Sequence, residues 1–165
     1  MGRLLRRKRV DDAPTDAGFW QVPERFNFAR DVVEAAAAVD RSRPALIRVD
    51  NGIIDRRTVT DVALEASRWT GLLRSRGLVP GDRLLVALGN SPEWHAVVVG
   101  ALKAGIVVVP CPPFTGASDL AARAGHSRAR LVVADMETAV ELARTAVQVN
   151  VVVAEDAAAE LRSVS

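Results

Sequence analysis

The chain has 165 residues, of which 49% are hydrophobic and 25% charged, the composition of an ordinary globular domain. This length suffices for one domain with a sizeable core, and the composition excludes a chain disordered throughout. Aromatic residues make up only 4% and tyrosine is absent, which argues against a base-stacking nucleic-acid surface.

Positive charge is concentrated at the N-terminus. The basic residues there are Arg3, Arg6, Arg7, Lys8 and Arg9, and no acidic residue precedes Asp11. The formal net charge of the chain is +2, so the rest carries 22 − 5 = 17 basic and 20 acidic residues, a net charge of −3. We predict that residues 1–21 form an irregular, solvated basic tail. Contact of this tail with anionic lipid, nucleic acid or a targeting receptor is the alternative.

The sequence also bears on the cellular compartment. Residues 1–25 lack the apolar central region of a signal peptide. Cys111 is the only cysteine, so no internal disulfide can form, and we predict a cytoplasmic protein. Between residues 96 and 114 the only charge is Lys103, but Gly105 and three prolines interrupt this stretch. It therefore predicts a helix followed by a strand, and no transmembrane segment.

A helix, a β-hairpin and a second helix are predicted in the first half of the chain. Apolar residues at helical spacing predict a helix over 28–40. Strands over 45–49 and 53–57 flank Asp50-Asn51-Gly52, which is typical of a β-hairpin. Thr58, with Asp61 three residues later, indicates a capping box that opens a helix ending at Gly77.

From residue 83 onward, strands and helices alternate. Strands are predicted over 84–88, 106–109, 131–134 and 151–153, with helices over 92–104, 118–125, 136–146 and 156–162. Short connections between such elements imply right-handed crossovers and a parallel sheet. The near-continuous apolar runs 84–88 and 106–109 predict strands buried on both faces. The expected fold class is α/β, with a mostly parallel sheet, crossover helices and an N-terminal β-hairpin.

No complete catalytic or metal site is visible in these residues. Gly100 to Gly105 is the nearest match to a phosphate-binding loop, but it ends a helix and no lysine follows Gly105. His95 and His126 are isolated, and Cys111 has neither a ligand partner nor a neighbouring base in sequence. We therefore predict no catalytic residue and no metal ligand.

Several segments together resemble the adenylate-forming superfamily, which comprises AMP-dependent synthetases and ligases. They are Phe26–Val32, Gly81-Asp82-Arg83, Asn90-Ser91-Pro92-Glu93-Trp94, Gly100–Pro110, Leu120–Arg123, His126-Ser127 and Ala129-Arg130. Their order is similar to that of the medium-chain acyl-CoA synthetase branch, and the likeness extends over about residues 22–145. The resemblance implies that residues 22–165 are an incomplete N-terminal subdomain of the adenylate-forming fold.

The resemblance also implies a two-step reaction. A fatty or aromatic carboxylic acid attacks ATP, with Mg²⁺ as a cofactor, and coenzyme A then displaces AMP to form the thioester. The family's phosphate loop, its adenine and ribose motifs and its catalytic lysine are expected after this region, and none occurs in the 165 residues. We therefore expect an N-terminal fragment of an acyl-CoA synthetase that is inactive alone and binds none of these cofactors tightly.

The resemblance makes three residues candidates for the wall of the family's acyl or pantetheine tunnel. Phe114 and Thr115 follow Pro112-Pro113, which replaces small or hydroxyl residues common in the medium-chain branch. Trp94 is the third candidate, with core packing as its alternative role.

A non-catalytic interaction module is the alternative function for the chain. It would dock on a synthetase, on another partner chain or on a second copy of itself. A parallel sheet without neighbours would leave apolar edges that need such cover.

Overall fold

The computed structural model describes residues 23–112, 114–146 and 148–163, so the predicted tail over 1–21 lies outside the described residues. The first element is a π-helix, η2 (Ala29–Glu34), which continues directly into α1 (Ala35–Val39). The predicted helix over 28–40 is therefore present, but its first half is a π-helix, whose turns are wider than those of an α-helix.

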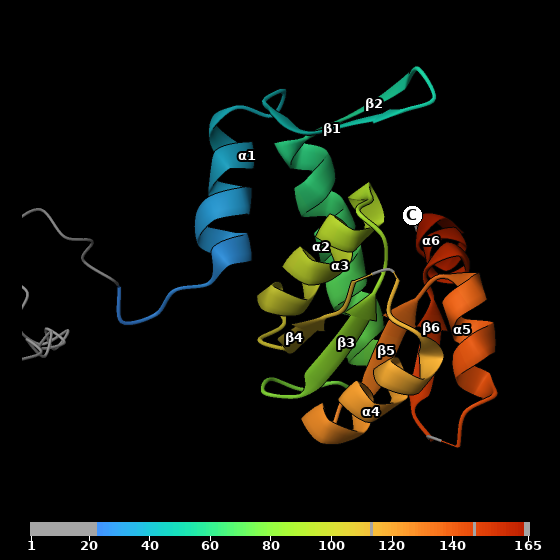
Figure 1. Ribbon diagram of the computed structural model, residues 1–165. Helices are drawn as coiled ribbons and strands as arrows, with labels where there is room; N and C mark the ends of the chain where they lie inside the picture. Colours follow the sequence, from blue (N-terminus) through green and yellow to red (C-terminus); the bar gives the residue numbers. More distant parts are fainter. Residues whose placement is uncertain (1–22, 113, 147, 164–165) are drawn as a thin grey trace, which may run out of the picture.

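The predicted hairpin is confirmed. Strands β1 (Pro44–Asp50) and β2 (Ile53–Thr58) pair antiparallel, with Val49 opposite Ile54. Asn51 and Gly52 connect them with φ values of 48° and 81°, the left-handed geometry that a two-residue hairpin turn requires. The hairpin projects away from the body of the molecule (Figure 1).

The remaining elements form a doubly wound α/β unit. In chain order they are α2 (Val59–Ser75), β3 (Arg83–Ala87), α3 (Pro92–Lys103), β4 (Val107–Pro110), α4 (Ala117–Ser127), β5 (Leu131–Ala134), α5 (Met136–Ala143), β6 (Asn150–Val153) and α6 (Ala154–Ser163). The strand order is β4-β3-β5-β6, and all three pairings are parallel. The predicted capping box is present: Asp61 N–H donates to Thr58 Oγ1, and Thr58 N–H donates to the Asp61 carboxylate.

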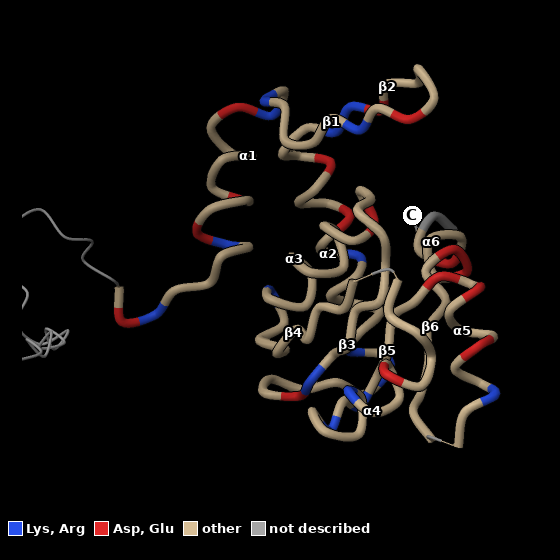
Figure 2. The backbone as a smooth tube through the Cα atoms, viewed as in Figure 1, with Lys and Arg blue, Asp and Glu red and all other residues tan. Residues whose placement is uncertain are grey.

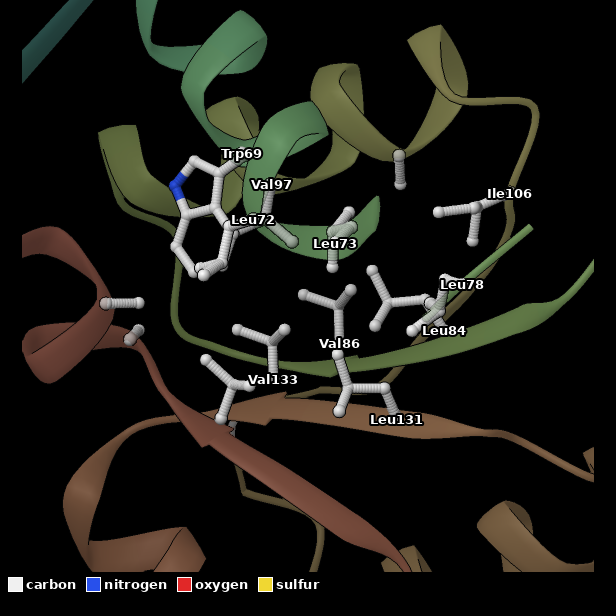
Figure 3. Close-up of a cluster of buried hydrophobic side chains, with 14 of the residues drawn as sticks. Trp69, Leu72, Leu73, Leu78, Leu84, Val86, Val97, Ile106, Leu131 and Val133 are labelled. Atoms are coloured by element: carbon white, nitrogen blue, oxygen red, sulfur yellow. The ribbon is translucent and has the colours of Figure 1, made fainter. Parts of the chain in front are cut away.

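Alternating side chains of the central strands divide the core between two faces of the sheet. Leu84, Val86 and Val133 point toward α2, α3 and α6 and form the larger cluster with Trp69 and Leu73 (Figure 3). On the opposite face, the cluster consists of Leu85, Ala87, Cys111, Leu120, Ala121, Ala124, Val132, Ala134 and Leu142, contributed in part by α4 and α5. The two central strands β3 and β5 are therefore buried on both faces, as predicted for residues 84–88.

The same expectation for residues 106–109 is wrong, because β4 lies at the edge of the sheet. Val107 is 50% exposed, and among the described strands β4 pairs with β3 alone. The amides of Val107 and Cys111 donate to carbonyls of the β3 segment, at Asp82 and Val86. A short apolar run cannot show whether one or two neighbours flank the strand, because both situations favour β-branched residues.

Helices α2 and α3 approach closely at Gly100. Thr70 Oγ1 donates to the carbonyl oxygens of Ala66 and Gly100, at 2.9 Å each, so a buried hydroxyl joins the two helices. A Cβ atom on Gly100 would lie 2.6 Å from the Ala66 oxygen and 2.8 Å from Trp69 Cβ. The missing side chain of Gly100 thus sets the distance between these helices.

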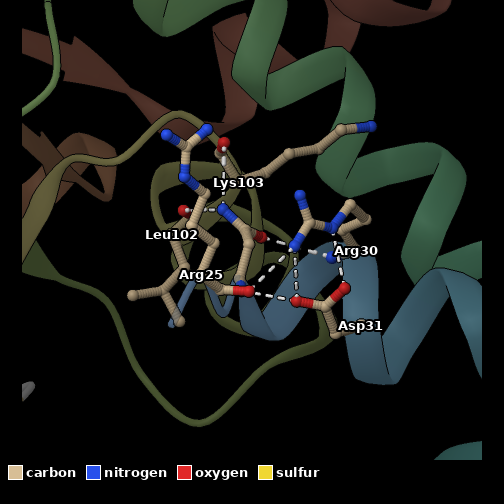
Figure 4. A network of polar contacts seen from close by, with 6 residues as sticks. Arg25, Arg30, Asp31, Leu102 and Lys103 are labelled. Carbon is tan, nitrogen blue, oxygen red and sulfur yellow. Dashed lines mark hydrogen bonds and ion pairs between the residues drawn. The ribbon is translucent and has the colours of Figure 1, made fainter. Parts of the chain in front are cut away.

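A polar network attaches the N-terminal segment to the end of α3 (Figure 4). Asn27 Nδ2 donates to the carbonyl oxygens of Leu102 and Lys103, at 3.0 and 3.4 Å, and so caps that helix end. The Arg30 guanidinium, with the Asn27 amide, holds the pKa of Asp31 down at about 2. Asn27 therefore fixes where the chain enters η2.

Candidate functional site at the carboxyl edge of the sheet

The strand order creates a switch point between β3 and β5. From β3 the chain passes to β4 on one side, and from β4 it crosses to β5 on the other side. In open α/β sheets, such a reversal leaves a crevice outside the carboxyl ends of the two strands, where ligands typically bind. The segments that follow β3, β5 and β6 are therefore the candidate site.

A cleft of about 430 Å³ occupies this position. Its lining residues come from the hairpin, from the β3–α3 connection and from the starts of α5 and α6: Arg48, Leu88, Gly89, Ser91, Glu93, Asp135, Ala154, Glu155 and Ala158. Two further pockets adjoin this cleft. One, of about 540 Å³, lies between β1 and the start of α3, and the other, of about 360 Å³, lies between α2, α3 and α6. We call the central cavity the switch-point cleft.

Two helix caps shape the cleft. Ser91 Oγ accepts a hydrogen bond from the Trp94 amide at 3.2 Å, and Asp135 Oδ1 accepts one from the Thr138 amide at 2.8 Å. Each residue directly follows a sheet strand or its short connection, because the chain must turn there from strand to helix. The caps fix the starts of α3 and α5 on either side of the cleft.

Carboxylates dominate the charge of the switch-point cleft. Glu93, Asp135 and Glu155 line it, whereas the one lining cation, Arg48, already pairs with Asp50 at 2.8 Å. Acidic residues also mark the segments where α5 and α6 begin (Figure 2). A cleft with this excess of negative charge repels phosphate groups, so its lining residues do not fit a nucleoside triphosphate.

The adjoining pocket adds a half-buried carboxyl group. Burial raises the pKa of Glu65; Arg57, whose Nη1 lies 2.9 Å from Glu65 Oε1, opposes this rise, and the charge of Glu93 adds to it. Within the described part of the chain, no three histidine, cysteine or carboxylate side chains are grouped to hold a metal ion.

Comparison with known proteins identifies the family. Residues 33–164 match the family described as AMP-binding enzyme. The chain belongs to the AMP-binding enzyme family. A curated relative, acyl-coenzyme A synthetase ACSM2, mitochondrial, of Rattus norvegicus, is 31% identical over 136 residues, which cover 78% of this chain and 24% of the relative. For acyl-coenzyme A synthetase ACSM2A, mitochondrial, of Homo sapiens, the identity is 30%, with 76% of this chain and 23% of the relative covered. The chain thus spans about a quarter of the length of these relatives.

Solved structures share the fold of this AMP-binding family member. The N-terminal domain of FACL13 from Mycobacterium tuberculosis superposes with a TM-score of 0.75 at 22% identity, covering 86% of this chain and 37% of that chain. An acyl-CoA synthetase of Brucella canis gives a TM-score of 0.69 at 24% identity, covering 78% and 23%. The parallel α/β unit is therefore part of a larger fold in these neighbours, as the sequence predicts.

The three tunnel candidates are not among the residues that line the carboxyl-edge cavities of this family member. Trp94 is half-buried in the first turn of α3, packs against the larger core cluster and contacts the His95 ring edge-to-face at 5.0 Å between centroids. Phe114 is 87% exposed, and the Thr115 amide donates to the Pro112 oxygen in a turn. None of the three lines the switch-point cleft or its two neighbouring pockets. Their tunnel role stays a prediction, and Pro113 lies outside the described residues.

Other residues singled out in the sequence have structural surroundings. Gly105 follows the end of α3 with φ of 74°, at the edge of the sheet opposite to the cleft. Cys111 is buried, and burial raises the pKa of its thiol, which disfavours a nucleophilic thiolate. His95 Nδ1 lies 2.9 Å from the backbone carbonyl oxygen of Ser91.

Sequence reasoning missed Arg48, Asp135 and Glu155 as lining residues. The available signal was position: Asp135 directly follows a predicted strand, and Glu155 comes two residues after the next predicted strand.

No helix in the described ranges has the length and apolar character needed to cross a membrane.

Gly81-Asp82-Arg83 of the family resemblance organises the amino edge of the sheet. Asp82 Oδ2 accepts from the Val79 amide and from Arg130 Nη1, both at 2.8 Å. Arg83 donates to the carbonyl oxygens of Ser127 and Arg128 at the end of α4. Asp82 and Arg83 therefore join β3 to α4 and to the segment before β5.

Replacing Asp82 with asparagine should make the free energy of unfolding decrease less steeply as the pH is lowered into the acid range. The Val79 amide, with Arg130, lowers the pKa of Asp82 in the folded state below its unfolded value of about 3.9. The charged form thus stabilises the fold above that unfolded value, and this contribution is lost as the pH falls through the lower folded pKa. Urea unfolding at a series of pH values between neutrality and this acid range measures the effect. An exposed carboxylate variant, Glu141→Gln, should keep the wild-type slope, and equal slopes for Asp82→Asn and wild type would contradict this account.

Proposed function

We propose that this chain supplies the N-terminal wall and sheet of an acyl-CoA synthetase and is catalytically inactive alone. In the complete enzyme, a fatty or aromatic carboxylic acid would be adenylated with ATP and Mg²⁺ and then transferred to coenzyme A. Support comes from the family, from relatives named acyl-coenzyme A synthetases and from the quarter of their length that this chain spans.

One observation argues for inactivity of the isolated chain: the charge of the switch-point cleft. Its Glu93, Asp135 and Glu155 face no free cation among the lining residues, because Arg48 pairs with Asp50. Adenylation needs positive groups around the phosphates where charge develops. A further part of the enzyme would have to provide them.

ATP–pyrophosphate exchange tests this proposal. The purified chain, supplied with Mg²⁺ and either medium-chain or aromatic acids, should show no exchange above the protein-free background. A complete acyl-CoA synthetase provides the positive control. Robust exchange by this chain alone would overturn the proposal.

The second candidate function is an interaction module that docks on a synthetase, on another chain or on a second copy. The hairpin favours it, because Ile47, Val49, Ile53 and Ile54 are between 53% and 73% exposed, and an isolated two-stranded ribbon is only marginally stable. Light scattering, which reports the oligomeric state, and amide hydrogen exchange, which reports protection of the hairpin, test whether the hairpin requires a partner. A monomer whose hairpin amides are as protected as those of β3 would contradict this function.

The proposal also includes a cytoplasmic location. The lone cysteine, Cys111, is buried and suits a reducing compartment. The two mammalian relatives, in contrast, are named mitochondrial.

A further inference from the structure

The tip of the β1–β2 hairpin places a side-chain amide next to an unobstructed backbone nitrogen. Asn51 directly precedes Gly52, and both residues are exposed. Within the described part of the chain, neither the Asn51 side chain nor the Gly52 N–H has a hydrogen-bond partner. Glycine has no Cβ, and even a Cβ built on Gly52 would meet no atom within 4 Å. Nothing therefore shields the Gly52 nitrogen from the Asn51 side chain.

The other asparagines of the chain have different surroundings. The Asn27 side-chain amide donates to two carbonyl oxygens at the end of α3, which holds it in place. The residues that follow Asn27, Asn90 and Asn150 all carry a Cβ, which crowds the backbone nitrogen that each side chain would have to reach. Asn51 is the only asparagine followed by glycine.

The hairpin gives this turn freedom to open. It projects away from the body of the molecule (Figure 1), and an isolated two-stranded ribbon is only marginally stable. Asn51 has a φ of 48°, in the left-handed region that residues with a side chain adopt less readily than glycine. When the turn opens, Asn51 can leave this conformation, and its side-chain carbonyl carbon can approach the Gly52 nitrogen.

We propose that Asn51 is a site of self-modification, at which the opened hairpin turn converts asparagine to aspartate and isoaspartate. The Gly52 nitrogen forms a bond to Asn51 Cγ. The C–N bond of the side-chain amide breaks, and ammonia leaves with the proton that the Gly52 nitrogen loses. Water then opens the cyclic imide. Attack at Cγ gives aspartate, and attack at the backbone carbonyl carbon gives isoaspartate.

The isoaspartate product does not fit the hairpin. Its backbone runs through Cβ and Cγ, so the connection is longer than the tight turn that sets Asp50 opposite Ile53. It also adds a carboxylate next to Asp50, whose own carboxylate already pairs with Arg48 at 2.8 Å. The two strands should therefore lose their register once Asn51 is modified.

Incubation of the full chain at mildly alkaline pH, followed by proteolysis and mass spectrometry, tests the proposal. The peptide that contains Asn51 should lose ammonia and gain water, and it should separate into an aspartate and an isoaspartate form. Peptides that contain Asn27, Asn90 or Asn150 should stay unmodified over the same period. Amide hydrogen exchange of the modified chain should show a loss of protection in the hairpin, with unchanged protection in β3.

Two variants and a matched control separate the chemistry from the opening of the hairpin. Asn51→Gly removes the side-chain amide and keeps a residue suited to the left-handed turn, so its hairpin peptide should stay unmodified and protected. Ile54→Ser removes the cross-strand partner of Val49, so the modification should be faster by about two- to fivefold. Leu64→Ser alters a side chain on α2 that is 55% exposed, as Ile54 is 53% exposed, and should leave the rate unchanged.

Three outcomes would overturn the proposal. They are an Asn51 peptide that stays unmodified, equal modification of Asn51 and Asn90, and the same rate in Ile54→Ser as in wild type. Full hairpin protection in the isoaspartate form would contradict the predicted loss of register. These measurements need neither ATP nor a carboxylic acid, so their outcome is independent of the exchange assay.

Discussion

Gly100→Ala is expected to lower the free energy of unfolding by about 2 kcal/mol, because overpacking a tight contact typically costs about 1–3 kcal/mol. The added Cβ would lie 2.6 Å from the Ala66 oxygen and 2.8 Å from Trp69 Cβ, so α3 must move away from α2. That movement also stretches the hydrogen bond from Thr70 Oγ1 to the Gly100 oxygen, now 2.9 Å. Urea unfolding of the purified chain, followed by circular dichroism, measures the change.

Gly71→Ala is the matched control for this substitution. Gly71 lies in α2, and a Cβ there would meet no atom within 4 Å. Alanine in an open helical position stabilises relative to glycine, by about 0.5–1 kcal/mol. The two changes should therefore have opposite signs, and stabilisation by both would show that the helices separate at no cost.

Leu73→Ala is expected to cost about 3–4 kcal/mol, within the range for leucine truncation in a packed core. Leu73 is fully buried in the larger cluster, between α2 and the central strands (Figure 3). Truncation removes apolar contacts and leaves a cavity that rigid helices and strands fill only in part. For a chain of this size, the melting temperature should fall by about 10 °C.

Leu64→Ala provides the comparison on the same helix. The Leu64 side chain is 55% exposed, so its loss removes little buried area. The expected change in unfolding free energy is within about 0.5 kcal/mol, as for most surface substitutions. Similar losses for Leu64→Ala and Leu73→Ala would contradict the placement of the core.

Local chemistry made most element boundaries predictable. Asn51-Gly52 has few alternatives to a tight hairpin turn, and Thr58 with Asp61 can satisfy the first amides of α2 from sequence alone. The π-helix was not predictable, because Ala29–Glu34 has ordinary helical spacing and no breaker residue. Ala29 and Val33 pack against α2 and α3, and such tertiary contacts cannot be read from the local sequence.

The candidate site was less predictable than the fold. A parallel sheet can be inferred from alternating strands and helices, but the order β4-β3-β5-β6 decides which strand ends meet. Arg48 enters the switch-point cleft from the hairpin, and the sequence does not show where the hairpin lies relative to the sheet. The acidic character of the cleft follows from that placement, together with the preference of carboxylates for helix starts.

The end of β4 at Pro110 determines how this sheet can grow. Because the amides of Val107 and Cys111 point toward β3, those of alternate residues point outward, and Pro110 has no amide to offer. Val108 is left as the single outward donor on that strand. A new strand could not form a regular ladder there, whereas β6 (Asn150–Val153) contains no proline. An added strand would therefore pair with β6 rather than with β4. One edge of the sheet is closed to further pairing, and the other is open to it.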